Sequence, residues 1–151
     1  MKSLWDPTAR LEILRRIDRL TPETQPQWGR MNAEEMLAHI VAGMRMGMGE
    51  LPTRERRTVF RYWPLKHLFV YWVPFPRSAY APREIVTRGL KNGSTWEADA
   101  SALRASITAF ETMTPRGRRW PTHPIFGPLS GSAWGALGWR HLDHHLRQFG
   151  L

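Results

Sequence analysis

Histidines are the residues with the widest chemistry in this chain of 151 residues, and three of the six fall within five positions near the C-terminus. His141 and His145, in the stretch RHLDHHLRQFG, are four residues apart, so a helix would place both imidazoles on one side, one turn apart. That spacing lets two nitrogens from one helix reach a single metal ion. His144 is rotated by about 100° from His145 in helical terms, so we expect it to be exposed or to support the ligands.

A third nitrogen is available on another predicted helix. His39 lies among Met36, Ile40 and Gly43 on an apolar stripe. It is either a core histidine bonded to a neighbour or, if the two helices pack together, a third ligand. Three neutral imidazoles with a water would leave an open coordination position of the catalytic type. Leu142 stands where the H-E-x-x-H motif has its glutamate, so the sequence does not favour a zincin protease.

Two polar residues lie one turn from the predicted ligands. Glu35 precedes His39 by four residues and is placed to accept its free N–H, but it also follows Asn32 by three, the spacing of a capping box, and both roles stay open. Gln148 follows His145 by one turn, where it would hold the imidazole or bind a polar group of a substrate.

The other two histidines carry weaker signals. His123 directly precedes Pro124, and we expect it to make a local hydrogen bond in a turn rather than to line the mouth of a pocket. His67 lies in an aromatic run, where we expect it to be at the surface or partly packed.

Four segments that carry helix start and stop signals must position these residues. The first begins at Asp6-Pro7 and ends at Thr21-Pro22, and the second opens with the Asn32–Glu35 pair. The third is capped by Ser94, with Glu97 at the matching offset, and stops before Thr114-Pro115. The fourth runs from Ser130 or Ser132 to Phe149, with Gly150 as the residue after the helix. The third helix is predicted to bury Leu103, Ile107 and Phe110.

A long connection rich in proline and aromatic residues, 50–93, separates the second and third helices. We expect a short helix near 64–72, then an extended stretch through PRSAYAPREIV and a turn at Asn92-Gly93. Because no internal repeat or strand alternation is present, the predicted fold is an all-α four-helix bundle, with residues 1–151 forming a single domain.

The composition excludes several classes of site. The chain contains no cysteine, so disulfides and thiolate ligands are ruled out, and any metal must be held by His, Asp or Glu. The formal net charge is +9, but the 19 arginines and 3 lysines are scattered, with clusters at 54–57 and 115–119, so nucleic-acid binding ranks low. The N-terminus meets charge and proline before any apolar run, and LFVYWVPFP is too short to span a bilayer. We therefore expect a cytoplasmic protein with no transmembrane segment.

The combination of motifs resembles a known superfamily. NAEEMLAHI, followed far downstream by HPIFGPLSGSAWGALGWRHLDHHLRQFG, is similar to the DinB/YfiT-like superfamily, closest to a branch catalogued as a domain of unknown function. The resemblance extends from about Leu11 to Gly150. Its most specific pieces are the histidine of the second helix, H-P-x-F-G-x-L at 123–129 and H-x-x-H-H-x-x-Q at 141–148.

The resemblance implies a four-helix bundle, often dimeric, with His39, His141 and His145 as ligands of a divalent metal. Nickel or zinc is the first expectation, and iron or manganese are alternatives. Several members of the superfamily are transferases or isomerases that use a low-molecular-weight thiol. The chain departs from its branch at Ala133, where relatives tend to carry an acidic residue before the tryptophan, which weakens the expected cap of the last helix.

Two functional hypotheses follow. The first is a metal-dependent transferase or hydrolase in which the metal activates a thiol or water, or polarises a carbonyl. The second is a non-catalytic helical domain for binding or dimerisation. In that case the aromatic run 59–76, flanked by Arg56, Arg57 and Arg77, would contact a partner or an anionic membrane, although a lid folded onto the chain's own core is favoured. The sequence does not distinguish the substrate, the reaction or the metal.

Overall fold

The computed structural model describes residues 1–77 and 94–151, and this part of the chain is mostly helical with one small sheet. The elements in chain order are α1 (Pro7–Ile17), α2 (Ala33–Met48), a 3₁₀ turn (Val59–Arg61), α3 (Leu65–Tyr71), α4 (Trp96–Thr108), a second 3₁₀ turn (Ala109–Glu111), β1 (Thr122–His123), β2 (Gly127–Pro128) and α5 (Gly131–Gln148). The extended stretch predicted beyond Arg77 and the turn predicted at Asn92-Gly93 lie outside the described residues.

Side-chain caps define the starts of three predicted helices as expected. The Asp6 carboxylate accepts the N–H of Thr8, with proline at the first position of α1. Asn32 and Glu35 form the predicted capping box of α2. The Ser130 hydroxyl accepts the N–H of Ala133, so α5 is capped without an acidic residue.

The cap predicted for the third main helix is off by one residue. Thr95, rather than Ser94, is the N-cap of α4, and its hydroxyl accepts the N–H of Ala98. The Ser94 hydroxyl instead donates to the Asp99 carboxylate at 2.8 Å. Both residue types suit an N-cap, and the choice between neighbours depends on the backbone entering the helix, which the sequence does not specify.

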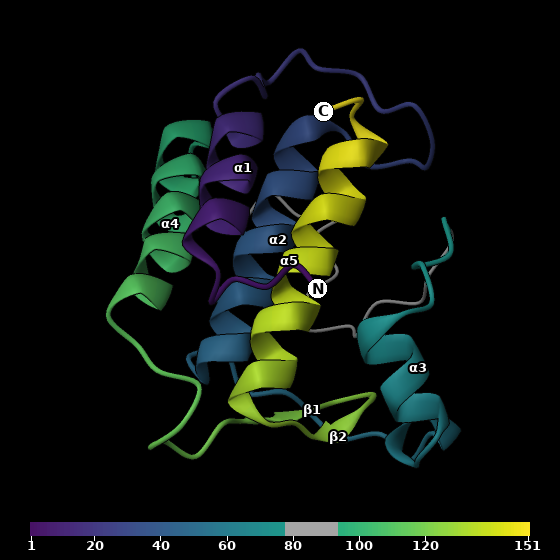
Figure 1. Cartoon of the computed structure of the whole chain (residues 1–151). Helices are drawn as coiled ribbons and strands as arrows, with labels where there is room; N and C mark the ends of the chain where they lie inside the picture. The colour runs from purple at the N-terminus through teal and green to yellow at the C-terminus, as the bar shows by residue number, and fades with distance from the viewer. Residues whose placement is uncertain (78–93) are drawn as a thin grey trace.

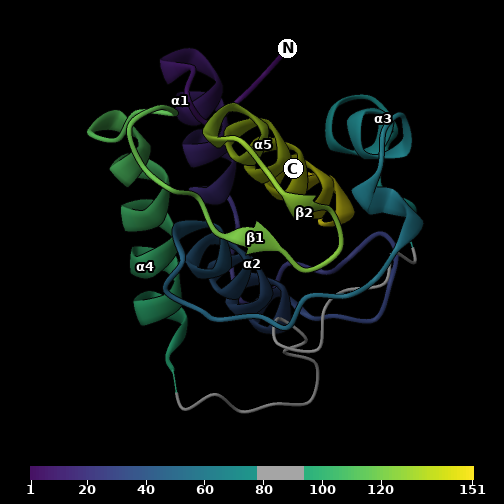
Figure 2. The same cartoon turned by 90° about the horizontal axis from the view of Figure 1, so that it is seen from below.

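Four helices surround one apolar core. α2 contacts α4 and α5, and α1 contacts the same two helices, so the four form a closed ring of neighbours (Figures 1 and 2). The most deeply buried side chains of this core come from all four, and they include Ile13, Met36, Leu37, Ile40, Leu103, Ile107, Leu142 and Leu146. The predicted burial of Leu103, Ile107 and Phe110 is confirmed. Packing α2 against α5 brings the predicted ligand helices together.

The short helix α3 confirms the helix predicted near 64–72, and it lies outside this ring against α5 (Figure 2). Val70 is fully buried in a second apolar cluster that includes Trp134 and Leu137 of α5. Arg140 of α5 donates hydrogen bonds to two carbonyl groups at the end of α3, those of Phe69 and Val73. The inner side of the aromatic segment is therefore folded onto the protein.

The all-α prediction is wrong at one place, because β1 and β2 form an antiparallel hairpin before α5. His123 pairs with Gly127 across the hairpin, and its Nδ1 accepts the backbone N–H groups of Ile125 and Phe126, both at 3.1 Å. Gly127 has a positive φ of 71°, which favours glycine. The local hydrogen bond predicted for His123 is thus confirmed, and the strands were missed because two residues are too few to show an alternation.

None of the helices in the described residues is both long enough and apolar enough to cross a membrane.

Candidate metal centre

Three histidines from two helices converge where α2 packs on α5. Nε2 of His39 and Nε2 of His141 lie 3.1 Å apart, and the ring centroid of His145 is 4.7 Å from that of His39 and 4.8 Å from that of His141. One ring nitrogen from each histidine lies within 4.8 Å of the other two. The proximity that the helical spacing and the expected helix packing predicted is therefore present.

The spacing suits a common ion. Two nitrogens bound at about 2.05 Å in a tetrahedral zinc site are about 3.3 Å apart, close to the distance between His39 and His141. The widest separation in the group would have to contract by about 1.5 Å at most, which side-chain rotation of one imidazole supplies. The donor set, three imidazoles without a carboxylate, is one that zinc, nickel and other borderline divalent metals accept.

Burial keeps two of these imidazoles, those of His141 and His145, in the neutral form. His39 and His145 are 5 % and 7 % exposed, and His141 is partly buried. Burial, followed by the nearby His39, lowers the pKa of His145 to about 3, although the hydrogen bond to Gln148 raises it. Burial and then His145 hold the pKa of His141 well below its ordinary value. The neutral form carries the lone pair that binds a metal, so the ligand nitrogens need not release a proton at neutral pH.

Gln148 fixes the orientation of His145. Its side-chain oxygen lies 2.9 Å from Nδ1 of His145, and its amide nitrogen donates to the backbone oxygen of Trp28 at 2.9 Å. The second bond assigns the amide oxygen to the histidine, so Nδ1 carries the proton and donates it. The lone pair of His145 is then on Nε2, the nitrogen left for a metal.

Glu35 has the capping role that the sequence left open, since its carboxylate accepts the N–H of Asn32 at 3.1 Å. A role of Glu35 toward His39 stays a prediction.

The remaining histidines lie outside the ligand group. His144 is partly buried, and its ring contacts those of Trp28, Phe75 and His145 at centroid distances of 6.3, 5.7 and 5.1 Å. His67 is exposed and packs on Tyr71, with centroids 4.8 Å apart. Both positions agree with the sequence expectations.

Sequence reasoning missed two aromatic neighbours of the centre. Phe75, in the segment that follows α3, lies with its ring 6.4 Å from that of His141, and the guanidinium of Arg140 sits 5.2 Å above the Phe75 ring. Trp28 comes from the connection between α1 and α2 and contacts His144. Nothing in the local pattern around either residue points to the histidines, because both contacts depend on how long connections fold back.

The described residues define a mostly helical protein with two buried histidines and one partly buried histidine grouped between two helices. The chain belongs to a family described as a protein of unknown function (DUF1569), whose model matches residues 4–150. The predicted membership in a family of unknown function is therefore confirmed. No curated protein and no solved structure gives a match.

Proposed function

We propose that this chain is a metalloprotein of the DinB/YfiT-like type, a cytoplasmic homodimer of four-helix bundles, in which His39, His141 and His145 hold a divalent cation. Nickel or zinc is the expected ion, with iron or manganese as alternatives. The proposal is supported by one observation above all, the convergence of three ring nitrogens from α2 and α5 within 4.8 Å. The DinB/YfiT-like assignment rests on the sequence motifs.

We further propose metal-dependent transfer or hydrolysis as the activity. A divalent ion held by three imidazoles lowers the pKa of a bound thiol or water and so supplies a nucleophile at neutral pH. The chain has no cysteine, so a thiol nucleophile would be a low-molecular-weight cosubstrate. Gln148 would hold His145 in the tautomer that binds, while the burial of His39 and His145 would limit competing water.

The test is direct. Purified protein stripped with a chelator is titrated with zinc and with nickel, and bound metal is measured by mass spectrometry after gel filtration. We expect one ion per chain, and loss of at least tenfold in affinity for His39→Ala and for His145→Ala. His144→Ala is the matched control, because it removes an adjacent imidazole from outside the ligand group. Equal metal binding by the wild type and both ligand variants contradicts the site.

A second function is supported by the same geometry. A distance of 3.1 Å between two Nε2 atoms also fits a hydrogen bond between neutral imidazoles, in which one donates and the other accepts. The histidines would then be a buried polar pair in a non-catalytic binding or dimerisation domain. In that case His39→Ala and His141→Ala would lower stability in the presence of a chelator, and added metal would not raise the wild-type melting temperature.

A further inference from the structure

The described part of the segment after α2, residues 49–77, exposes an unusual number of large apolar side chains. Seven such side chains are exposed in the described residues, and five of them lie between residues 59 and 72. We call these five the aromatic face: Val59, Tyr62, Trp63, Leu68 and Trp72, which are 62 %, 71 %, 83 %, 41 % and 64 % exposed. Exposed large apolar side chains are ordinarily scattered singly over the surface of a soluble protein, so their concentration in one short segment points to a binding surface.

The aromatic face is not needed to attach α3 to the protein. Val70 and the partly buried Phe69 make the inner contact with α5. Leu68 and Trp72 are four residues apart, on the side of α3 opposite Val70. Among the helices of the described residues, α3 lies outermost on this side, beyond α5 (Figure 2). The outer apolar side chains are therefore available to another surface.

The surroundings of the aromatic face are strongly basic. Between residues 51 and 77 the chain has six basic residues against one acidic residue, and that residue, Glu55, is paired with Arg61 at 2.8 Å. A groove of about 590 Å³ is lined by Arg56, Arg57 and Arg61 alongside Val59 and Tyr62, and it also contains Glu55, whose carboxylate is paired with Arg61. An anionic group in this groove would lie beside the apolar side chains.

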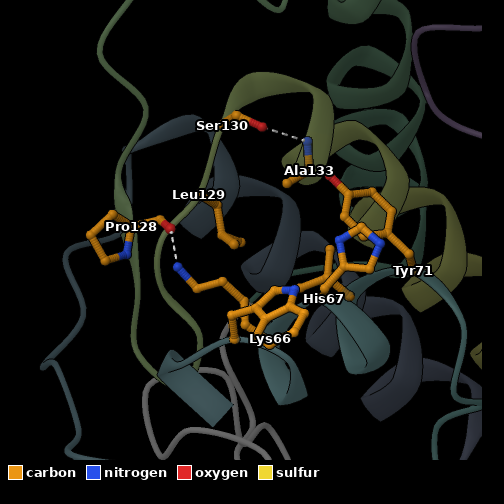
Figure 3. Close-up of a pocket in the computed structure, with 9 residues that line it drawn as sticks. Lys66, His67, Tyr71, Pro128, Leu129, Ser130 and Ala133 are labelled. Atoms are coloured by element: carbon orange, nitrogen blue, oxygen red, sulfur yellow. Dashed lines mark hydrogen bonds between the residues drawn. The ribbon is translucent and has the colours of Figure 1, made fainter.

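Trp63 combines with a cationic side chain at a second pocket. It borders a pocket of about 290 Å³ between α3 and the start of α5, together with Lys66, His67 and Tyr71 (Figure 3). The Lys66 ammonium donates to the backbone oxygen of Pro128 at 2.9 Å, which holds the lysine at this pocket. Trp63 and the Lys66 ammonium thus border the same pocket.

We propose that the aromatic face docks this protein on the surface of an anionic membrane. Tryptophan and tyrosine are the side chains that settle at the boundary between headgroups and acyl chains, because their rings are apolar and carry one polar group. Leu68 and Val59 would enter the acyl boundary, and the arginines beside them would face lipid phosphates. Docking would place the whole protein at the membrane surface, and it does not depend on the proposed metal site.

The charge around the aromatic face disfavours a second copy of this chain as its binding partner. A symmetric dimer through the aromatic face would bring the same arginine-rich segments of the two copies together, and like charges at close range oppose association. Single-stranded nucleic acid shares the charge complementarity, but it stacks on ring faces and gains little from aliphatic side chains such as Val59 and Leu68. An anionic lipid surface uses every component of the face.

Vesicle flotation tests the proposal with the full chain. The probes are phosphatidylcholine vesicles with and without about one third phosphatidylserine, at low and high salt. We expect flotation with the anionic vesicles at low salt, at least tenfold weaker binding to pure phosphatidylcholine, and a marked loss at high salt because surface charges are then screened. Absence of binding that depends on anionic lipid overturns the proposal.

Variants distinguish the contribution of the aromatic face to vesicle binding from that of the protein's overall positive charge. Trp63→Ala with Trp72→Ala should lower vesicle affinity at least tenfold, and Arg57→Ala about fivefold. The matched control is Leu11→Ala with Arg15→Ala, which removes an exposed apolar side chain and an exposed charge from α1, on the other side of α5 (Figure 2). Circular dichroism and metal content should be unchanged in all three.

Three results contradict docking on a membrane. The first is equal loss of vesicle binding in the control and the tryptophan variant. The second is tight binding of a single-stranded oligonucleotide that depends on Trp63 and Trp72 without vesicle binding. The third is a dimer in light scattering that the tryptophan variant dissociates, which would assign the face to a second copy.

Discussion

His39 and His141 are separated by 102 positions in the chain, yet their Nε2 atoms lie 3.1 Å apart. Gly43, one turn after His39 on α2, makes this approach possible. A Cβ at this position would lie 3.0 Å from Cε1 and 3.2 Å from Nδ1 of His141. The missing side chain of Gly43 is thus the space that the His141 ring occupies, and α2 and α5 come close enough to share a ligand group.

Gly43→Ala should therefore weaken metal binding without unfolding the protein. The new methyl group displaces the His141 ring by a few tenths of an ångström or more, which misplaces one of the three nitrogens. Alanine also favours the helix by about 1 kcal/mol relative to glycine, so the melting temperature of the chelated protein should not fall much. We expect metal affinity to drop about tenfold in a competition titration with a chromogenic chelator.

Gly47→Ala provides the matched control, one turn further along α2. Its Cβ would meet the ring of Trp134 at 3.2 Å, a similar crowding that does not involve a histidine. Metal affinity in this variant should equal that of the wild type. If both glycine variants weaken metal binding equally, Gly43 has no specific role at the site.

Substitutions of Gln148 should show whether this residue orients His145 for metal binding or only contributes to packing. Gln148→Leu removes the oxygen that accepts from Nδ1 of His145 and the amide that donates to Trp28, so metal affinity should fall between about tenfold and a hundredfold. Gln148→Glu keeps an acceptor for His145 but loses the donor to Trp28. Its metal affinity should recover to within a few-fold of the wild type, while its stability should stay lower.

The two variants are compared by zinc titration and by thermal unfolding with a chelator present. A purely structural role for Gln148 predicts that both quantities fall together in both variants. Recovery of affinity without recovery of stability in Gln148→Glu is the expected signature of a positioning residue.

The helices and the ligand candidates were accessible from the sequence because both follow from local rules. The Asp6-Pro7 start and the Asn32–Glu35 capping box depend on residues three positions apart or fewer, and the pairing of His141 with His145 depends on the helical repeat. His39 was predicted as a third ligand because it lies on the same apolar stripe as Gly43, and such a stripe predicts burial against another helix.

What the sequence did not predict depends on distant contacts. Phe75 reaches the histidines because Arg140 binds carbonyl groups at the end of α3, and no short-range pattern encodes that bond. The β1–β2 hairpin was missed for a different reason. Its strands are two residues each, and its turn is held by the His123 side chain rather than by a pattern of alternating residues.

His123 should make the protein sensitive to acid. Burial lowers its pKa from 6.5 to about 3, and its Nδ1 accepts two backbone N–H groups, which requires the neutral ring. The unfolded chain takes up a proton below pH 6.5 and the folded chain does not until about pH 3, so stability is complete above 6.5 and is lost as the pH falls through this window. The expected loss is about 2 kcal/mol between pH 6.5 and 5 from this residue.

His123→Asn isolates this contribution, because an asparagine oxygen accepts the same two N–H groups and does not titrate. The other histidines are the same in both proteins, so the difference between their unfolding free energies reports His123 together with its charge coupling to His141. In urea unfolding with a chelator present, the wild type should lose stability more steeply than the variant, by about 1.4 kcal/mol per pH unit below 6.5.

His123→Ala should be less stable than the asparagine variant at every pH, because both N–H groups lose their acceptor. Parallel pH profiles of wild type and His123→Asn would mean that the ring already carries a proton in the folded hairpin, and the double acceptance at Nδ1 would then be wrong.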